Sequence, residues 1–192
     1  ISQTELLSII IGSLSGVAHL HDYNIWHRDL KLENLFRTDS GTIKLFDLGL
    51  GLHASGEFTK SLVGTPAYAS PEQVNLIYDR DSSGYSSKHD MFQLAVIYFI
   101  LVAGYHPFVP KTGNVKLRNK KTFENIRGKE IRLRQNETIP YDQRILTLIN
   151  KCGSKDPKAR PTAKEALRMA IDISKEIETE GRIEGAKQVS VL

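Results

Sequence analysis

An almost unbroken apolar run from Leu94 to Tyr105 constrains the fold of this 192-residue chain more than any other feature. The run has twelve residues, whereas a helix that spans a membrane needs about 20. Asp90 and His106 bound it closely, so a helix buried on all sides within a domain fits better than a membrane span. We therefore expect no transmembrane segment and a core built around a helix over about 88–103.

Composition narrows the class of protein. The hydrophobic fraction of 40% and the charged fraction of 25% are typical of soluble globular proteins, and the length fits one ordinary domain. The single cysteine, Cys152, excludes an internal disulfide framework and favours a reducing compartment, so we expect a cytoplasmic, intracellular protein. Residues 1–5 do not resemble a signal peptide, and a chain that starts at Ile1 fits a fragment or a processed product.

Local patterns predict a mainly α-helical domain with a small β-hairpin region, an α+β fold. Helical spacing of apolar residues, a turn-forming sequence at 38–41 and a boundary at Pro161 carry this prediction. The expected helices cover about 6–22, 88–103, 122–127, 142–152 and 162–178, and the expected strands cover 34–37 and 42–47. We place one domain at 1–178 and a loosely ordered tail at 179–192. The polar stretch 49–69 is long for a connection inside a domain, which is typical of functional or mobile loops.

Polar groups cluster where the predicted hairpin begins and ends. Asp29, Lys31 and Asn34 lie within six residues of one another, and Asp47 stands at the end of the second strand. Adjacent strands lie about 4.8 Å apart, so the hairpin brings Asn34 and Asp47 close together. Amide and carboxylate oxygens suit Mg²⁺, which takes few protein ligands and completes its shell with phosphate oxygens and water. Asp29 could then orient a hydroxyl group, and Lys31 could neutralise a phosphoryl group in transfer.

Five motifs in order resemble those of eukaryotic protein kinases of the serine/threonine type. They are the catalytic-loop sequence His27-Arg-Asp-Leu-Lys-Leu-Glu-Asn34, the metal-binding Asp47-Leu-Gly49, the Ser70-Pro-Glu72 that closes the activation segment, Asp90-Met-Phe92, and Asp156-Pro-Lys-Ala-Arg-Pro161. Leu48 replaces the usual Phe, Ser70 the usual Ala, and Phe92 the usual Trp. The resemblance covers nearly the whole chain and corresponds to the large C-terminal lobe of the kinase domain.

The resemblance implies roles for individual residues. Asp29 would be the catalytic base, Lys31 would contact the γ-phosphate of ATP, and Asn34 and Asp47 would hold Mg²⁺. Thr65 would bond to Asp29 and Lys31 and help to fix the substrate. The sequences around Lys31 and Thr65 are similar to the serine/threonine-specific pattern, so the implied reaction transfers the γ-phosphoryl group of ATP to a protein Ser or Thr hydroxyl.

Other residues are given structural or regulatory roles by the same resemblance. His27 and Asp90 would pack and anchor the catalytic loop, and Glu72 and Arg160 would form a buried ion pair. Arg28 would receive a phosphate placed on the activation segment. The candidate hydroxyls for that phosphate, each of which could equally be a plain solvated side chain, are Ser55, Thr59 and Ser61.

Kinase chemistry also needs parts that this chain does not contain. A Gly-rich loop over the phosphates, a strand Lys and a helix Glu would lie in an N-terminal lobe preceding residue 1. We therefore expect the isolated chain to have little or no activity and to expose apolar surface that the absent lobe would cover. The alternatives are a non-catalytic pseudokinase or scaffold that acts by protein binding, and a small-molecule kinase of related fold. The glycines at 49 and 51 match part of a dinucleotide-binding fingerprint, but no amphipathic helix follows them.

A basic segment covers residues 111–134. It carries nine Lys or Arg residues against Glu124 and Glu130, a net charge of +7. Phe123 is its only aromatic residue, which argues against binding of single-stranded nucleic acid, and we expect no nucleic-acid partner. The segment is either a solvated surface or a docking face for an acidic partner or a lipid headgroup.

Overall fold

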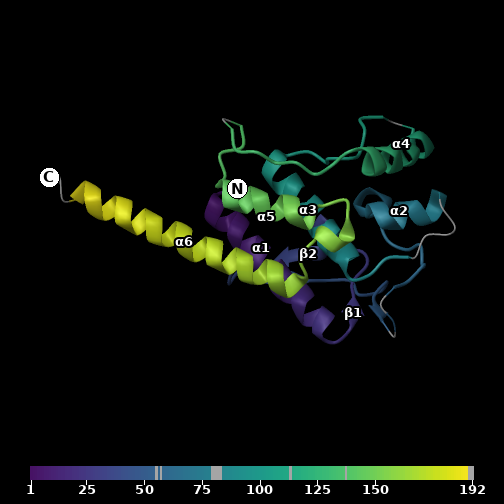
Figure 1. Ribbon diagram of the computed structural model, residues 1–192, viewed down its shortest axis with the longest axis horizontal. Helices are drawn as coiled ribbons and strands as arrows, with labels where there is room; N and C mark the ends of the chain where they lie inside the picture. The colour runs from purple at the N-terminus through teal and green to yellow at the C-terminus, as the bar shows by residue number, and fades with distance from the viewer. Residues whose placement is uncertain (55, 57, 79–83, 113, 137, 190–192) are drawn as a thin grey trace.

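The computed structural model describes residues 1–54, 56, 58–78, 84–112, 114–136 and 138–189, and for residues 183–189 only the backbone. The fold is mainly helical with two small antiparallel sheets, which confirms the predicted fold class (Figure 1). The helices are α1 (Gln3–Asp22), α2 (Pro71–Tyr78), α3 (Lys88–Ala103), α4 (Val115–Gly128), α5 (Gln143–Cys152) and α6 (Ala163–Val189). The strands are β1 (Ile25–Trp26), β2 (Leu35–Arg37), β3 (Ile43–Leu45) and β4 (Leu52–His53), and short 3-10 turns form η1 (Leu32–Asn34), η2 (Pro66–Tyr68) and η3 (Pro157–Ala159).

Helix α3 is the centre of the core. All residues from His89 to Phe99 are buried, as the apolar run predicted, and α3 ends at Gly104, whose left-handed backbone (φ 76°) closes the helix. Helices α1 and α5 pack against α3, and α6 lies along both α1 and α5. No helix among these described residues is long and apolar enough to cross a membrane.

The two sheets flank the polar cluster. Strands β2 and β3 form the expected hairpin, with Leu35 opposite Leu45 and Arg37 opposite Ile43. Strands β1 and β4 form a second, two-residue antiparallel pair that the sequence patterns do not predict. Strand β1 ends directly before the loop from His27 to Lys31, and β2 begins shortly after it. Paired strands therefore hold the chain on both sides of this loop.

Two predicted helices are longer in the structure. The segment expected at 122–127 extends back to an N-cap at Asn114, whose side chain accepts a hydrogen bond from Leu117 N. The segment from 179, which we expected to be a loosely ordered tail, is helical as far as Val189. Helix α6 continues to that residue as one helix that extends beyond the other elements (Figure 1). Ion pairs from Arg144 to Glu176 and Glu180 hold this part of α6 to α5.

Candidate active site

Helix α3 holds the loop that carries Asp29. The buried carboxylate of Asp90 accepts hydrogen bonds from the backbone N–H groups of His27 and Arg28, each at 2.9 Å, and contacts His21 Nε2 at 2.8 Å. Arg28 has a left-handed backbone with φ 67°, an uncommon conformation for a side chain of this size. The two bonds from Asp90 maintain that conformation and turn the next residue, Asp29, toward the site.

Gln93 supports the same loop one turn further along α3. Its Oε1 accepts a hydrogen bond from Leu30 N at 2.9 Å, and its Nε2 donates to Arg28 O at 3.2 Å. The backbone on both sides of Asp29 is therefore bound to α3. The sequence patterns did not identify Gln93. A single amide side chain between the apolar residues Phe92 and Leu94 indicates a buried polar group that needs hydrogen-bond partners.

The carboxylate of Asp29 accepts hydrogen bonds from two other residues. Its Oδ1 accepts from Thr65 N at 2.8 Å and Thr65 Oγ1 at 2.7 Å, and its Oδ2 accepts from Lys31 Nζ at 2.8 Å. Burial alone would raise the pKa of Asp29, but the hydrogen bonds from Lys31 and Thr65 outweigh it and hold that pKa below its usual value. The group is therefore ionised at neutral pH. Among the described contacts Thr65 bonds to Asp29 and not to Lys31.

Lys31 lies among carboxylates. The hydrogen bond to Asp29 raises the pKa of Lys31, and the negative charges of Asp29, Asp47 and Glu33 add to that effect against its partial desolvation. The Lys31 ammonium therefore stays charged, and it lies close enough to Asp47 for the negative charge of that carboxylate to raise the pKa of Lys31. A cation at this point can contact a phosphate group without losing its anchor on Asp29.

Asn34 and Asp47 come together through the hairpin. Phe46 N donates to Asn34 O at 2.9 Å, which places Asp47 directly beyond the residue paired with Asn34. Asn34 Nδ2 donates to Asp29 O at 2.9 Å, so the amide oxygen is left for another ligand. Asp47 is exposed, has a left-handed backbone (φ 62°), and uses only Oδ1 in a 3.2 Å bond from Gly49 N.

This donor set fits Mg²⁺ better than a metal enclosed by protein ligands. The set consists of one amide oxygen, on Asn34, and one carboxylate, on Asp47, whose charge acts on the Lys31 ammonium. Within the ranges that the structure describes, no group of three His, Cys, Asp or Glu side chains is placed to hold a metal ion. Mg²⁺ commonly uses one or two carboxylates and takes its other ligands from phosphates and water.

The residue before Thr65 allows it to approach Asp29. Gly64 has φ +97°, and a Cβ atom there would lie 2.6 Å from Arg28 O. Only glycine permits both that backbone conformation and that contact. Gln73 Nε2 donates to Val63 O at 2.7 Å and holds the other side of this turn.

Among the described residues, neither Thr59 nor Ser61 forms a hydrogen bond with Arg28, although Arg28 lies beside Tyr85, which bonds to both of their backbones. Arg28 is nearly buried and its Nε donates to Leu50 O at 2.7 Å. Thr59 forms an isolated β-bridge with Tyr85, and Tyr85 Oη donates to Ser61 O at 2.8 Å, so both segments are held through their backbones. Ser55 lies outside the described residues.

His27, Glu72 and Arg160 have structural contacts. His27 Nε2 contacts Phe46 O at 3.0 Å, which ties the loop to the hairpin. Arg160 forms a two-bond ion pair with Glu72, with N···O distances of 2.7 and 2.8 Å. Cys152 is buried, and burial raises the pKa of its thiol to about 12, so it is a core residue and not a nucleophile.

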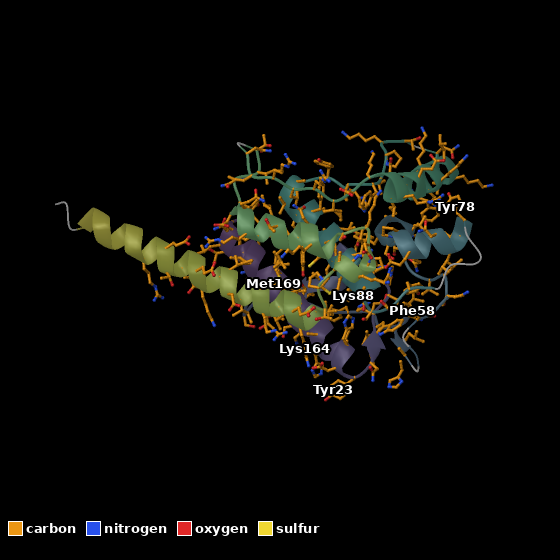
Figure 2. The ribbon with its side chains drawn as sticks, viewed as in Figure 1. Tyr23, Phe58, Tyr78, Lys88, Lys164 and Met169 are labelled. Atoms are coloured by element: carbon orange, nitrogen blue, oxygen red, sulfur yellow. The ribbon has the colours of Figure 1, made fainter. Side chains whose placement is uncertain are left out.

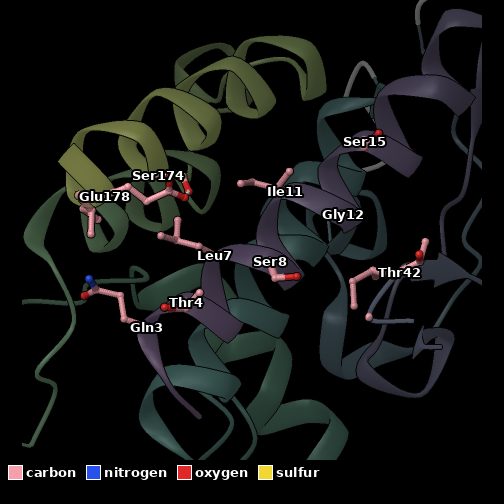
Figure 3. A pocket seen from close by; sticks show the side chains of 13 residues that line it. Gln3, Thr4, Leu7, Ser8, Ile11, Gly12, Ser15, Thr42, Ser174 and Glu178 are labelled. Atoms are coloured by element: carbon pink, nitrogen blue, oxygen red, sulfur yellow. Dashed lines mark hydrogen bonds between the residues drawn. The ribbon is translucent and has the colours of Figure 1, made fainter. Parts of the chain in front are cut away.

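A separate hollow lies away from Asp29, between α1, the β2–β3 turn and α6 (Figure 3). Its volume is about 530 Å³, and its lining is mostly small, hydroxyl-bearing or aliphatic. Glu178 is the only ionisable residue in that lining. The hollow therefore lacks a second group for acid–base chemistry, and the reactive groups gather around Asp29.

Comparison with known proteins agrees with this geometry. The mouse phosphorylase b kinase gamma catalytic chain, liver/testis isoform, is 35% identical over 169 residues, which cover 88% of this chain and 40% of that protein. The Caenorhabditis elegans serine/threonine-protein kinase plk-1 is 37% identical over 158 residues, which cover 81% of this chain and 22% of that protein. The chain thus spans about two fifths or less of the length of these relatives. The family model described as protein kinase domain matches residues 1–170, and the chain belongs to the protein kinase family.

Proposed function

We propose that this chain is the catalytic lobe of a serine/threonine protein kinase, which transfers the γ-phosphoryl group of ATP to a protein Ser or Thr hydroxyl when an N-terminal lobe completes it. The observation that carries the proposal is the Asp29 carboxylate, which Thr65 and Lys31 hold between them while Asn34 is bonded to the backbone of the same residue. The hydrogen-bond acceptor (Asp29), the cation (Lys31) and the proposed metal ligand (Asn34) are therefore all held together at Asp29.

Asp29 is suited to orient a hydroxyl group more than to remove its proton early. Its lowered pKa makes it a weak base at neutral pH. Phosphoryl transfer has a loose transition state in which positioning and charge neutralisation dominate, so a weak base that accepts the proton late is sufficient. Thr65 occupies both lone pairs of Oδ1, whereas Oδ2 accepts one bond from Lys31 and keeps a lone pair for the substrate hydroxyl.

Asn34 and Asp47 would hold Mg²⁺, which when bound neutralises charge on the phosphates. Apolar surface for the rest of the nucleotide lies on the adjoining hairpin, where Phe36 and Phe46 contact each other edge-to-face and are 58% and 51% exposed. Exposed aromatic rings beside a phosphate site suit a flat heterocyclic base.

The same surface supports the proposed second lobe. Leu48 is 49% exposed and lies two residues from Phe46 in the sequence, so exposed apolar side chains gather at this end of the hairpin. A patch of this kind commonly marks an interface. A second lobe that covers this patch would enclose the nucleotide. The 192-residue chain alone would leave one face of the nucleotide exposed.

A polypeptide substrate fits the surface beside Thr65. A hollow of about 140 Å³ adjoins that residue and is lined mainly by the aliphatic and aromatic side chains of Leu62, Val63, Pro66, Ala69, Val74, Ile77 and Phe123. It can take one apolar side chain of a peptide whose neighbouring hydroxyl faces Asp29. A small-molecule substrate would leave this hollow unused.

The test is phosphorylation of Ser, Thr and Tyr versions of one peptide by the full-length protein that carries this chain, with Mg²⁺ and ATP. We expect transfer to Ser and Thr only, and a loss of about 10²–10⁴-fold in kcat for Asp29→Asn. The 192-residue chain serves as the matched preparation without a second lobe and should be inactive. Transfer that is unchanged in Asp29→Asn, or no transfer by a full-length protein that binds its partners normally, would favour the scaffold alternative.

A further inference from the structure

Helix α4 carries a concentration of positive charge next to the segment that contains Thr65 and η2. Residues 91–123 contain no Asp or Glu, and Lys111, Lys116, Lys120 and Lys121 fall within or beside the first turns of this helix. In the part of the chain that the structure describes, none of these four lysines forms an ion pair. The cluster is therefore open to an anionic ligand from outside.

One side of α4 faces the hollow beside Thr65. Phe123 lines that hollow together with Thr65 and Ile77. Helical neighbours three, four and seven positions away share the side of Phe123. Within α4 these positions hold the exposed Lys116, Lys120 and Arg127, together with Asn119 and the buried Ile126. We call Lys116, Lys120 and Arg127 the basic stripe.

The contacts of α4 place the helix beside the segment that carries Thr65. The helix packs against both α2 and η2, which directly follows Thr65. The Arg127 guanidinium lies over the Tyr78 ring at the end of α2, 4.8 Å from its centroid. Figure 2 shows Tyr78 where α2 and α4 come together. The basic stripe thus continues the surface that begins at the phosphoacceptor position.

The orientation of α4 adds to the positive field. The first turn contains Lys116 and no acidic residue, so the positive end of the helix dipole coincides with positive side chains. Positive side chains at the positive end of the dipole destabilise the helix when no anion is bound, and they favour the binding of an anion nearby. The stripe thus combines a dipole, three cations and an adjacent apolar hollow.

We propose that the basic stripe of α4 binds an acidic segment of the protein substrate, a few residues from the Ser or Thr presented to Asp29. This inference rests on the proposed kinase function and names a substrate class for it. A polypeptide can fill the hollow with one side chain and reach the stripe with its neighbours, because the two surfaces are continuous through Phe123. A flat membrane does not enter that hollow, and Phe123 is the single aromatic residue of the basic segment, whereas proteins that bind single-stranded nucleic acid stack successive bases on several aromatic side chains.

Binding is tested first, without any requirement for catalysis. A fluorescent peptide with Ser flanked by Glu residues, and its copy with Gln in place of Glu, are titrated with the 192-residue chain at low and high salt. We expect the Glu peptide to bind more tightly, with an affinity that falls as salt rises. Lys116→Glu/Lys120→Glu should weaken binding of the Glu peptide by about fivefold or more.

A matched control separates this site from general charge. Lys121→Glu/Lys175→Glu makes the same change of net charge, but Lys121 lies on the other side of α4 and Lys175 on α6, so its effect should stay below about twofold. Equal thermal midpoints show that both variants are folded. Equal weakening by the two variants, equal binding of the Glu and Gln peptides, or stripe-dependent binding to anionic vesicles stronger than to the Glu peptide would overturn the proposal.

Kinetics then connect the site with substrate selection. In the full-length protein, Lys116→Glu/Lys120→Glu should raise KM for the Glu peptide by about the same factor, leave kcat unchanged and leave both constants for the Gln peptide unchanged. A fall in kcat for both peptides would instead show damage to the active site. If the full-length protein transfers no phosphate at all, the kinase proposal fails while the binding experiment still decides the docking surface.

Discussion

Arg160 and Glu72 are joined side-on across 88 residues of sequence, through Nη1–Oε1 and Nη2–Oε2 contacts of 2.7 and 2.8 Å. The Arg160 side chain is fully buried, and its guanidinium lies 4.9 Å from the centroid of the Phe92 ring. Burial alone would raise the pKa of Glu72, but Arg160 outweighs it and keeps that pKa low. The pair connects the start of α2, which follows Thr65 and η2, to the end of η3, which leads into α6.

Lysine cannot replace arginine at this position. Arg160 also donates to the carbonyl oxygens of Ser154, Lys88 and Lys155, and an ammonium group lacks the planar fork that reaches all of these acceptors. Arg160→Lys should therefore lower the free energy of unfolding by about 3 kcal/mol. Urea denaturation measures the change. The double variant Glu72→Met/Arg160→Met should lose less than the sum of its single variants, and strict additivity would show that the pair is not coupled.

The Asp90 carboxylate gives a second prediction, on both stability and activity. Asp90→Asn keeps the shape but replaces one of two acceptor oxygens by a donor, so one of the buried N–H groups of His27 and Arg28 loses its partner. We expect a loss of about 2 kcal/mol in unfolding free energy and a fall in kcat, because the loop no longer holds Asp29 in place. His21→Gln retains a donor toward Asp90 and serves as the control. Comparable kcat values for Asp90→Asn and His21→Gln would contradict this account.

Gly64 gives a prediction on backbone strain. Gly64→Ala would place a methyl group 2.6 Å from Arg28 O at a φ of +97°, so the turn has to move and take Thr65 with it. The expected costs are about 1–3 kcal/mol in stability and a reduced kcat. Gly128→Ala is the control, since a Cβ atom there meets no neighbour within 4 Å. Urea unfolding and initial-rate kinetics of the two variants should differ clearly, and equal behaviour would exclude the strain argument.

The parts of the site that depend on local sequence could be predicted, and the parts that depend on distant packing could not. The hairpin followed from turn residues at 38–41 and is present as β2 and β3. The proximity of Asn34 and Asp47 followed from it. The bond between Thr65 and Asp29 spans 36 residues, and only the family resemblance pointed to it. The pairing of β1 with β4 has two residues a side and no alternation of apolar residues, so no sequence pattern marks it.

Long-range hydrogen bonds explain other omissions. Tyr85 holds the backbones at 59 and 61, yet as a lone tyrosine before a helix it carries no pattern. The length of α6 was underestimated because the apolar spacing that predicts a buried face stops near Ile177. The structure holds Glu176 and Glu180 through Arg144 instead, and ion pairs between separate helices leave no periodic signal.

His106 makes stability dependent on pH. Burial lowers its pKa from 6.5 to about 4, and its Nδ1 accepts hydrogen bonds from Phe108 N and Val109 N, so the folded protein favours the neutral ring. Above pH 6.5 the ring is neutral whether folded or unfolded, and stability does not depend on it. Between pH 6.5 and about 4 the unfolded chain takes up a proton that the folded chain does not. The free energy of unfolding should therefore fall by about 3 kcal/mol across that interval.

Replacement of His106 isolates the contribution of this ring to the pH dependence of stability. His106→Asn keeps an acceptor for Phe108 N through its side-chain oxygen but does not titrate. Burial also lowers the pKa of His89, so the variant should lose part of the pH dependence and not all of it. Urea unfolding at pH 7.5, 6 and 5 gives the dependence of the unfolding free energy on pH for His106→Asn and for the unmodified chain. His19→Asn, at an exposed position, is the control. If the curves of His106→Asn and the unmodified chain run parallel, the neutral buried ring is not the cause.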